Sequence, residues 1–278
     1  MTTTVRTQGL GLTLFVLVAM SAPPTWAATA SQDETSDASI CQGYGPQTPR
    51  DIDQKAGTNR RMFSAAPPSD QMNLCNIHFH VNAEHRAAEF SIEADRGADG
   101  ESMGYQCNVT PTLSAEALAP LEGNACRGAE PGSTIEVHWV YTSCDVHPGK
   151  GLGSCLSEAC ANPNLRVEAQ VFVLVNDRNA LDFATVGYAG TMRNGYHQTE
   201  ALPDDTGDPV TFQGSTTGPS FDEQQCSPLK VTWSVRPRCA ALDIASLSTW
   251  CADNVFDEDY GHGVRELVTH AELLAPID

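Results

Sequence analysis

The stretch RVEAQVFVLVN at residues 166–176 constrains the fold of this 278-residue chain more than any other. Its alternate positions, beginning at Val167, are Val or Ala, and Phe172 and Leu174 make the opposite face apolar as well. A strand that is apolar on both faces is typical of the buried interior of a sheet. We therefore expect residues 166–176 to form a central strand that is covered on both sides.

Other patterns complete a strand-rich domain with few helices. The alternation in TIEVHWVYT predicts a half-buried strand, and the alternation in LKVTWSV predicts a strand with Leu229 facing inward. A serine followed two residues later by Glu and an Ala/Leu run is typical of a short capped helix. The further elements that we expect are strands at 134–142, at the start of 210–220 and at 229–235, and helices at 114–121 and 240–250.

The segment CNIHFHVNAEH carries half of a candidate metal site. Side chains two apart on a strand point to the same face, so His78 and His80 converge while Phe79 turns into the core. In TIEVHWVYT, His138 shares the polar face with Glu136, and we take His138 as the third ligand. Three neutral imidazoles that leave a fourth position open are typical of a catalytic zinc.

The N-terminal segment predicts export. An apolar run from Leu10 to Ala19 precedes small residues, which is the pattern of a secretory signal peptide at residues 1–28. The run is too short to span a membrane, and we find no other apolar stretch of spanning length. We expect a disordered acidic tether at 29–40. No linker divides residues 41–278, which we expect to form one domain of a secreted or periplasmic protein.

All ten cysteines follow the signal, and none forms a CxxC pair. An even number of cysteines in an exported chain favours disulfides over thiolate metal ligands. The spacing leaves the connectivity open, and local pairs such as Cys107 with Cys126 or Cys239 with Cys251 are examples. Residues 144–164 predict a loop that disulfides hold in place.

The charge of the chain excludes some classes of partner. It has 35 acidic and 16 basic residues and a formal net charge of −19. Such a surface repels phosphate backbones and anionic lipids. We therefore expect neither a nucleic acid nor a membrane surface as a partner.

Taken together, the motifs resemble the carbonic anhydrases of the δ class, whose site is similar to that of the α class. In the α class a His-x-His strand, a Glu-His pair, a Glu-x-His strand and a Gly-Ser-x-Thr-Thr loop before a Val-Thr-Trp strand follow one another. The same order occurs here in His78-x-His80, Glu84-His85, Glu136-x-His138, GSTTGP at 214–219 and VTW at 231–233. The segment GYGPQTPRDI is similar to the α-class arm, so the resemblance runs from about residue 41 to 235. It implies an α-carbonic-anhydrase-like fold of the α+β class with strands dominant, a large, mostly antiparallel twisted sheet with few short helices.

The resemblance also implies an activity, the reversible hydration of carbon dioxide to bicarbonate by a zinc-bound hydroxide. The three candidate ligands correspond to the zinc ligands of the family, and the same nitrogens are compatible with Co²⁺ or Cd²⁺. Glu136 corresponds to the carboxylate that orients the third ligand. Glu84 and Thr217 correspond to the pair that directs the attacking hydroxide, and shifting the loop alignment by one residue gives Thr216 this role instead.

The chain departs from the α class before the His-x-His strand, where no histidine stands at the position of the proton shuttle. His85, His147 and His197 are alternatives, or else ordinary surface or packing histidines. Val140 or residues near Phe212 are candidates for an apolar wall that would hold carbon dioxide.

Two other functions fit part of the pattern. His78-x-His80-x3-Glu84 has the spacing of a cupin motif, in which the glutamate is itself a ligand and iron or manganese supports oxidative chemistry. The glycine after the glutamate and the second cupin motif are missing. A non-enzymatic, exported zinc-binding module is the other alternative, although it gives no reason for Glu84 and GSTTGP to match a catalytic pattern. The sequence leaves the oligomeric state open.

Overall fold

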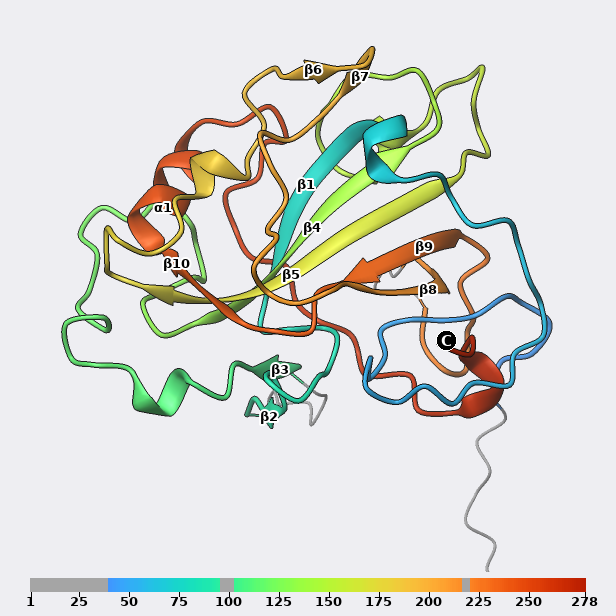
Figure 1. The fold of residues 1–278 in the computed structure, drawn as a ribbon, viewed down its shortest axis with the longest axis horizontal. Helices are drawn as coiled ribbons and strands as arrows, with labels where there is room; N and C mark the ends of the chain where they lie inside the picture. Colours follow the sequence, from blue (N-terminus) through green and yellow to red (C-terminus); the bar gives the residue numbers. More distant parts are fainter. Residues whose placement is uncertain (1–39, 96–102, 217–220) are drawn as a thin grey trace, which may run out of the picture. The chain divides into compact units, whose positions relative to one another are not determined.

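A six-stranded mixed sheet organises the residues that the computed structural model describes, namely 40–95, 103–216 and 221–278 (Figure 1). Its strands follow the order β1-β4-β5-β9-β8, and β10 also pairs with β5. The β1/β4, β4/β5 and β8/β9 pairs are antiparallel, and β5 is parallel to β9 and β10. The strands are β1 (Asn73–Val81), β4 (Thr134–Thr142), β5 (Leu165–Val175), β8 (Val210–Ser215), β9 (Lys230–Val235) and β10 (Ala240–Asp243). The predicted strand-rich fold is confirmed.

The central position predicted for residues 166–176 is also confirmed. β5 pairs with β4 along one edge and with β9 and β10 along the other. Phe172 and Leu174 belong to the hydrophobic core on one face of the sheet, and Val171 and Val173 belong to the core on the opposite face. The strand is therefore enclosed by protein on every side, as its two apolar faces require.

Strand β4 is more buried than the sequence predicts. We expected a half-buried strand, but all nine of its residues are buried. Its polar face, which carries Glu136 and His138, lies beneath other segments of the chain. Buried polar groups such as Glu136 and His138 need hydrogen-bond partners inside the protein.

The one α-helix among the described residues, α1 (Ile244–Ala252), packs on one face of the sheet through Ile244, Leu247 and Cys251 (Figure 1). The Asp243 carboxylate accepts hydrogen bonds from the backbone N–H groups of residues 245 and 246, which is a typical N-cap. The helix begins later than the predicted range 240–250, because residues 240–243 pair with β5 as β10.

Two further predictions were wrong. Residues 114–121 form a single turn rather than a helix: the Ser114 hydroxyl accepts from the Ala117 N–H, and Pro120 prevents continuation. Leu229 is 50% exposed, because β9 begins one residue later. The remaining short elements are η1 (Ser69–Gln71), β2 (Ile92–Glu93), β3 (Tyr105–Gln106), η2 (Thr110–Thr112), η3 (Leu152–Cys155), η4 (Phe183–Thr185), β6 (Met192–Arg193), β7 (Tyr196–His197) and η5 (Ala271–Leu273).

An irregularity in β1 determines which side chains face the site. The pairing of β1 with β4 shifts by one residue between Leu74 and Asn76. Such a bulge reverses the faces of the residues that follow it. Beyond the bulge, Ile77 and Phe79 face one core, as predicted for Phe79. His78 and His80, which alternate with them, face the opposite side of the sheet.

Five disulfides include all ten cysteines, so no free thiol is present. The local pairs offered as examples are wrong: Cys107 bonds to Cys239 and Cys126 bonds to Cys251. Proximity in the folded chain, rather than along the sequence, selects these partners. The other bonds are Cys41–Cys226, Cys75–Cys155 and Cys144–Cys160, of which the last two hold the 144–164 loop as predicted. Disulfides of this number are typical of oxidising compartments.

The described elements belong to one compact unit, Ala38–Asp278. The predicted signal peptide at 1–28, the tether up to residue 39 and Thr217 lie outside the described residues. Within the described ranges, no helix is long and apolar enough to cross a membrane.

Candidate metal centre

The three predicted ligands come together on the face of the sheet opposite α1. His78 and His138 are directly paired across β1 and β4, and His80 lies two residues further along β1. His78 Nε2 and His138 Nδ1 are 3.2 Å apart. One nitrogen from each of the three rings lies within 4.8 Å of the others, so the cluster could hold a metal ion.

The nitrogens that point away from the centre are anchored. His78 Nδ1 lies 2.7 Å from Asn76 Oδ1, and His80 Nδ1 lies 2.8 Å from the carbonyl oxygen of Gly263. When each Nδ1–H donates to these oxygens, each Nε2 keeps its lone pair for a metal. Neither anchor was predicted from the sequence. Asn76 was detectable, because it lies two residues before His78 on the same face of the strand, but a distant backbone carbonyl leaves no sequence signal.

Glu136 anchors the third ligand. Its Oε1 lies 2.9 Å from His138 Nε2 and 2.7 Å from His85 Nδ1, while its Oε2 accepts from the His85 backbone N–H at 3.0 Å. Burial alone would raise the pKa of Glu136, but attraction to His85 and the hydrogen bonds from His138 and His85 outweigh it and hold the pKa well below its usual range. His85 is fully buried, so it is a packing histidine rather than a surface one, and it is the second anchor of this carboxylate.

The electrostatics of the cluster favour neutral ligands. Burial, and then repulsion from the His138, His80 and His262 rings, lowers the pKa of His78 well below its usual value. Burial also lowers the pKa of His80, against the opposing attraction of Glu84. Neutral imidazoles are the form that binds metal. The donor set therefore fits a zinc ion held by three nitrogens.

A cavity of about 730 Å³ opens in front of the cluster and is bordered by His78, His80 and Glu84. The predicted apolar wall was wrong, because Val140 and Phe212 are buried in the core and do not border this cavity. Its apolar lining instead comes from Leu152, Phe221, Val264 and Val268. Leu152 begins the short helix η3 and the other three lie in loops, so a pattern of strand alternation gives no guide to them.

Glu84 lies beside the ligand cluster. Its side chain is 1% exposed, and its Oε1 is 3.9 Å from His80 Nδ1, the nitrogen that points away from the centre. Among the described residues, two groups of side chains could hold a metal, His78 with His80 and His138 and also His85 with Glu136 and His138, and neither includes Glu84. This position does not fit the cupin motif, in which the glutamate itself binds the metal. Thr216 is buried and its N–H donates to the Leu229 carbonyl at 2.9 Å, whereas Thr217 lies outside the described residues.

One histidine beside the site was not foreseen. The ring of His262 lies with its centroid 5.6 Å from that of His78 and 5.8 Å from that of His80, and it borders the cavity. Its Nε2 is 2.8 Å from Glu258 Oε1. The candidate shuttles His147 and His197 contact each other instead and do not border the cavity.

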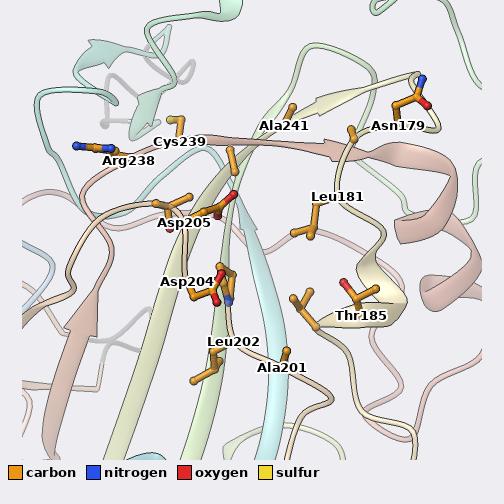
Figure 2. Close-up of a pocket in the computed structure, with 15 residues that line it drawn as sticks. Asn179, Leu181, Thr185, Ala201, Leu202, Asp204, Asp205, Arg238, Cys239 and Ala241 are labelled. Carbon is orange, nitrogen blue, oxygen red and sulfur yellow. The ribbon is translucent and has the colours of Figure 1, made fainter.

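A second cavity, of about 530 Å³, lies beside β10 (Figure 2). Its described lining includes the side chains of Leu181, Leu202, Asp204, Asp205 and Arg238, and it contains none of the predicted site residues. The histidine cluster therefore remains the candidate site.

Comparison with known proteins identifies the family of the chain. A model of the delta carbonic anhydrases matches residues 69–246. A search of curated proteins gave no significant match. Among solved structures, the α-carbonic anhydrase of Thermovibrio ammonificans, in complex with the inhibitor sulfanilamide, is 18% identical over 80% of this chain and 84% of that chain, with a TM-score of 0.29. The α-carbonic anhydrase of Photobacterium profundum is 18% identical over 81% and 85%, with a TM-score of 0.28. Because the family model covers more than half of the chain and includes all three histidines, the protein belongs to the delta carbonic anhydrase family.

Proposed function

We propose that the protein catalyses the reversible hydration of carbon dioxide to bicarbonate with a zinc ion held by His78, His80 and His138. The observation that carries the proposal is the convergence of three imidazoles whose outer nitrogens are all anchored. When bound, zinc would supply a Lewis acid that lowers the pKa of a water molecule to about 7 and so would provide a nucleophile at neutral pH.

The protein's own groups fix the tautomer and direction of each ligand. The Asn76 side-chain oxygen accepts a hydrogen bond from the Nδ1–H of His78, and the Gly263 carbonyl accepts one from the Nδ1–H of His80. Glu136 does the same for His138, and His85 holds Glu136 in place from behind. A ligand fixed in this way loses no freedom when it binds the metal, which raises the affinity of the site.

Glu84 and Thr217 are the pair to which we assign orientation of the nucleophile. Glu84 is buried at the edge of the cavity, where its carboxylate can accept a hydroxyl proton. The Thr217 hydroxyl would donate a hydrogen bond to Glu84 and accept one from the attacking oxygen. Leu152, Phe221 and Val264 would hold the uncharged substrate, in place of the wall predicted from sequence.

We propose that the catalytic domain, residues 41–278, works outside the cytoplasm as a secreted or periplasmic protein. The five disulfides support this location, since such bonds persist in oxidising compartments.

The test is metal analysis of the purified protein together with an assay of carbon dioxide hydration. The wild type should carry one zinc and be active, and His138→Ala should lose most of its zinc and all measurable activity, because one of three ligands is removed. His270→Ala, which removes an exposed imidazole that does not border the cavity, is the control and should behave as wild type.

A His138→Ala protein that kept its zinc and its activity would remove this site from consideration. Full zinc occupancy of the wild type without any hydration activity would favour a non-enzymatic zinc-binding module instead.

A further inference from the structure

A second pair of histidines lies outside the catalytic centre. His147 is in the loop between β4 and β5, and His197 is in β7. His147 Nδ1 and His197 Nε2 face each other 3.1 Å apart, and neither residue borders the catalytic cavity. His147 is exposed and His197 is partly exposed, so ions in solution reach the pair.

The geometry of this pair reproduces part of the catalytic cluster. The facing nitrogens of His78 and His138 are 3.2 Å apart with ring centroids at 5.0 Å, and the corresponding values for His147 and His197 are 3.1 Å and 5.1 Å. Two nitrogens that are each about 2.0–2.1 Å from one tetrahedral ion lie roughly 3.3 Å apart. The separation of the second pair is therefore suited to a shared ion.

The outer nitrogen of His197 is also anchored, as in the catalytic ligands. Tyr188 Oη lies 2.8 Å from His197 Nδ1, and the His197 backbone N–H donates to Asn73 Oδ1 at 2.9 Å. In the tautomer that donates Nδ1–H to Tyr188, the Nε2 lone pair points at His147. Partial burial, followed by repulsion from His147, lowers the pKa of His197, which favours the neutral ring.

The loop that carries His147 is fixed on either side. The Cys144–Cys160 disulfide closes the loop, and the Gly149 N–H donates to the Cys75 carbonyl at 3.0 Å. The backbone on both sides of His147 and the ring of His197 are thus held before any ion arrives. Asp145, two residues before His147, adds a negative charge that acts on His197, and the net charge of −19 attracts cations to the whole surface.

We propose that His147 and His197 form a second, solvent-accessible site for a divalent transition-metal ion such as Zn²⁺, completed by water. Imidazole ligands suit zinc and copper. With two protein ligands instead of three, the site binds more weakly than the catalytic centre. An ion there links the β4–β5 loop to the hairpin of β6 and β7, and it plays no part in carbon dioxide hydration.

Calorimetric titration of Zn²⁺ into protein that already carries its first equivalent tests the proposal. The wild type should take up one further equivalent, and His147→Gln and His197→Gln should both lose it while retaining the first zinc and the wild-type hydration rate. His270→Gln, a change at an exposed histidine elsewhere, should retain the second equivalent. Tyr188→Phe removes only the anchor and should weaken the second site by about 10- to 100-fold.

Absence of a second equivalent in the wild type, or its undiminished presence in both glutamine variants, would overturn the proposal and leave the pair as a simple N–H···N hydrogen bond. This result is independent of the proposed function, because the second equivalent is counted whether or not the protein hydrates carbon dioxide. Circular dichroism of each variant establishes that loss of the equivalent is not loss of the fold.

Discussion

At the scale of single residues, the site depends on hydrogen bonds that offset the cost of burying the Glu136 carboxylate. Glu136 is fully buried, and an unpaired carboxylate there would cost several kcal/mol. Three hydrogen bonds, from His138 Nε2, His85 Nδ1 and the His85 backbone N–H, supply the compensation. The hydrogen bond from His138 both stabilises the buried carboxylate and orients His138 as the third ligand, so Glu136 contributes to stability and to function at once.

Glu84→Gln separates the metal-binding and orienting roles. The substitution preserves size and leaves the three imidazoles unchanged, so zinc should remain bound at one equivalent. Hydration should fall by on the order of a hundredfold, because an amide that also donates replaces the acceptor-only carboxylate that directs the nucleophile. Zinc content and hydration rate are measured on the same preparation. Joint loss of zinc and activity would instead identify Glu84 as a ligand, as in a cupin, and unchanged activity would show that Glu84 is only structural.

At the scale of elements, the site depends on a segment that runs along the free edge of β1. The His262 N–H donates to the Phe79 carbonyl and the Val81 N–H donates to the His262 carbonyl, both at 2.9 Å. This places the Gly263 carbonyl against His80. The approach is close enough that a Cβ on Gly261 would lie 2.3 Å from the Val81 side chain.

Gly261→Ala should therefore push this segment away from β1. We expect a loss of about 1–3 kcal/mol in the free energy of unfolding, as for other overpacked sites, together with weaker zinc binding because His80 loses its anchor. Denaturant titration and zinc affinity are the measurements. Gly263→Ala is the matched control, since a Cβ there meets nothing within 4 Å. Equal effects of the two substitutions would show that close packing at Gly261 is not what holds the segment.

At the scale of the whole molecule, disulfides connect segments that the sheet alone does not hold. Cys126–Cys251 ties the loop before β4 to the end of α1, across a sequence separation of 125. Cys144–Cys160 closes a local loop with a separation of 16. A cross-link that closes a longer loop removes more entropy from the unfolded chain.

Replacing both cysteines of a pair by alanine should thus cost more for Cys126 and Cys251 than for Cys144 and Cys160. From loop length, the expected losses are about 5 and about 3 kcal/mol in the free energy of unfolding. Denaturant unfolding without reductant gives both values, and thiol titration of each unfolded variant should find no free thiol. A larger loss for the Cys144–Cys160 pair would mean that local packing, rather than chain entropy, dominates.

The sequence by itself determined β1, β4 and β5 and the shared face of His78 and His80, whereas the pairing of β1 with β4 brings His138 to them. The physical reason is that strand periodicity is local: residues two apart share a face, so alternation places each side chain without knowledge of the rest of the chain. The same reasoning placed Glu136 beside His138, where the structure also has it.

Only the tertiary structure decided the features that join distant segments. These are the disulfide partners of Cys107 and Cys126, the Gly263 carbonyl against His80, and the loop residues that line the cavity. It also turned residues 240–243 from an expected helix into β10, because pairing with β5 outweighs a weak local preference. Such contacts depend on how the chain folds back on itself, and a local pattern carries no record of its partner.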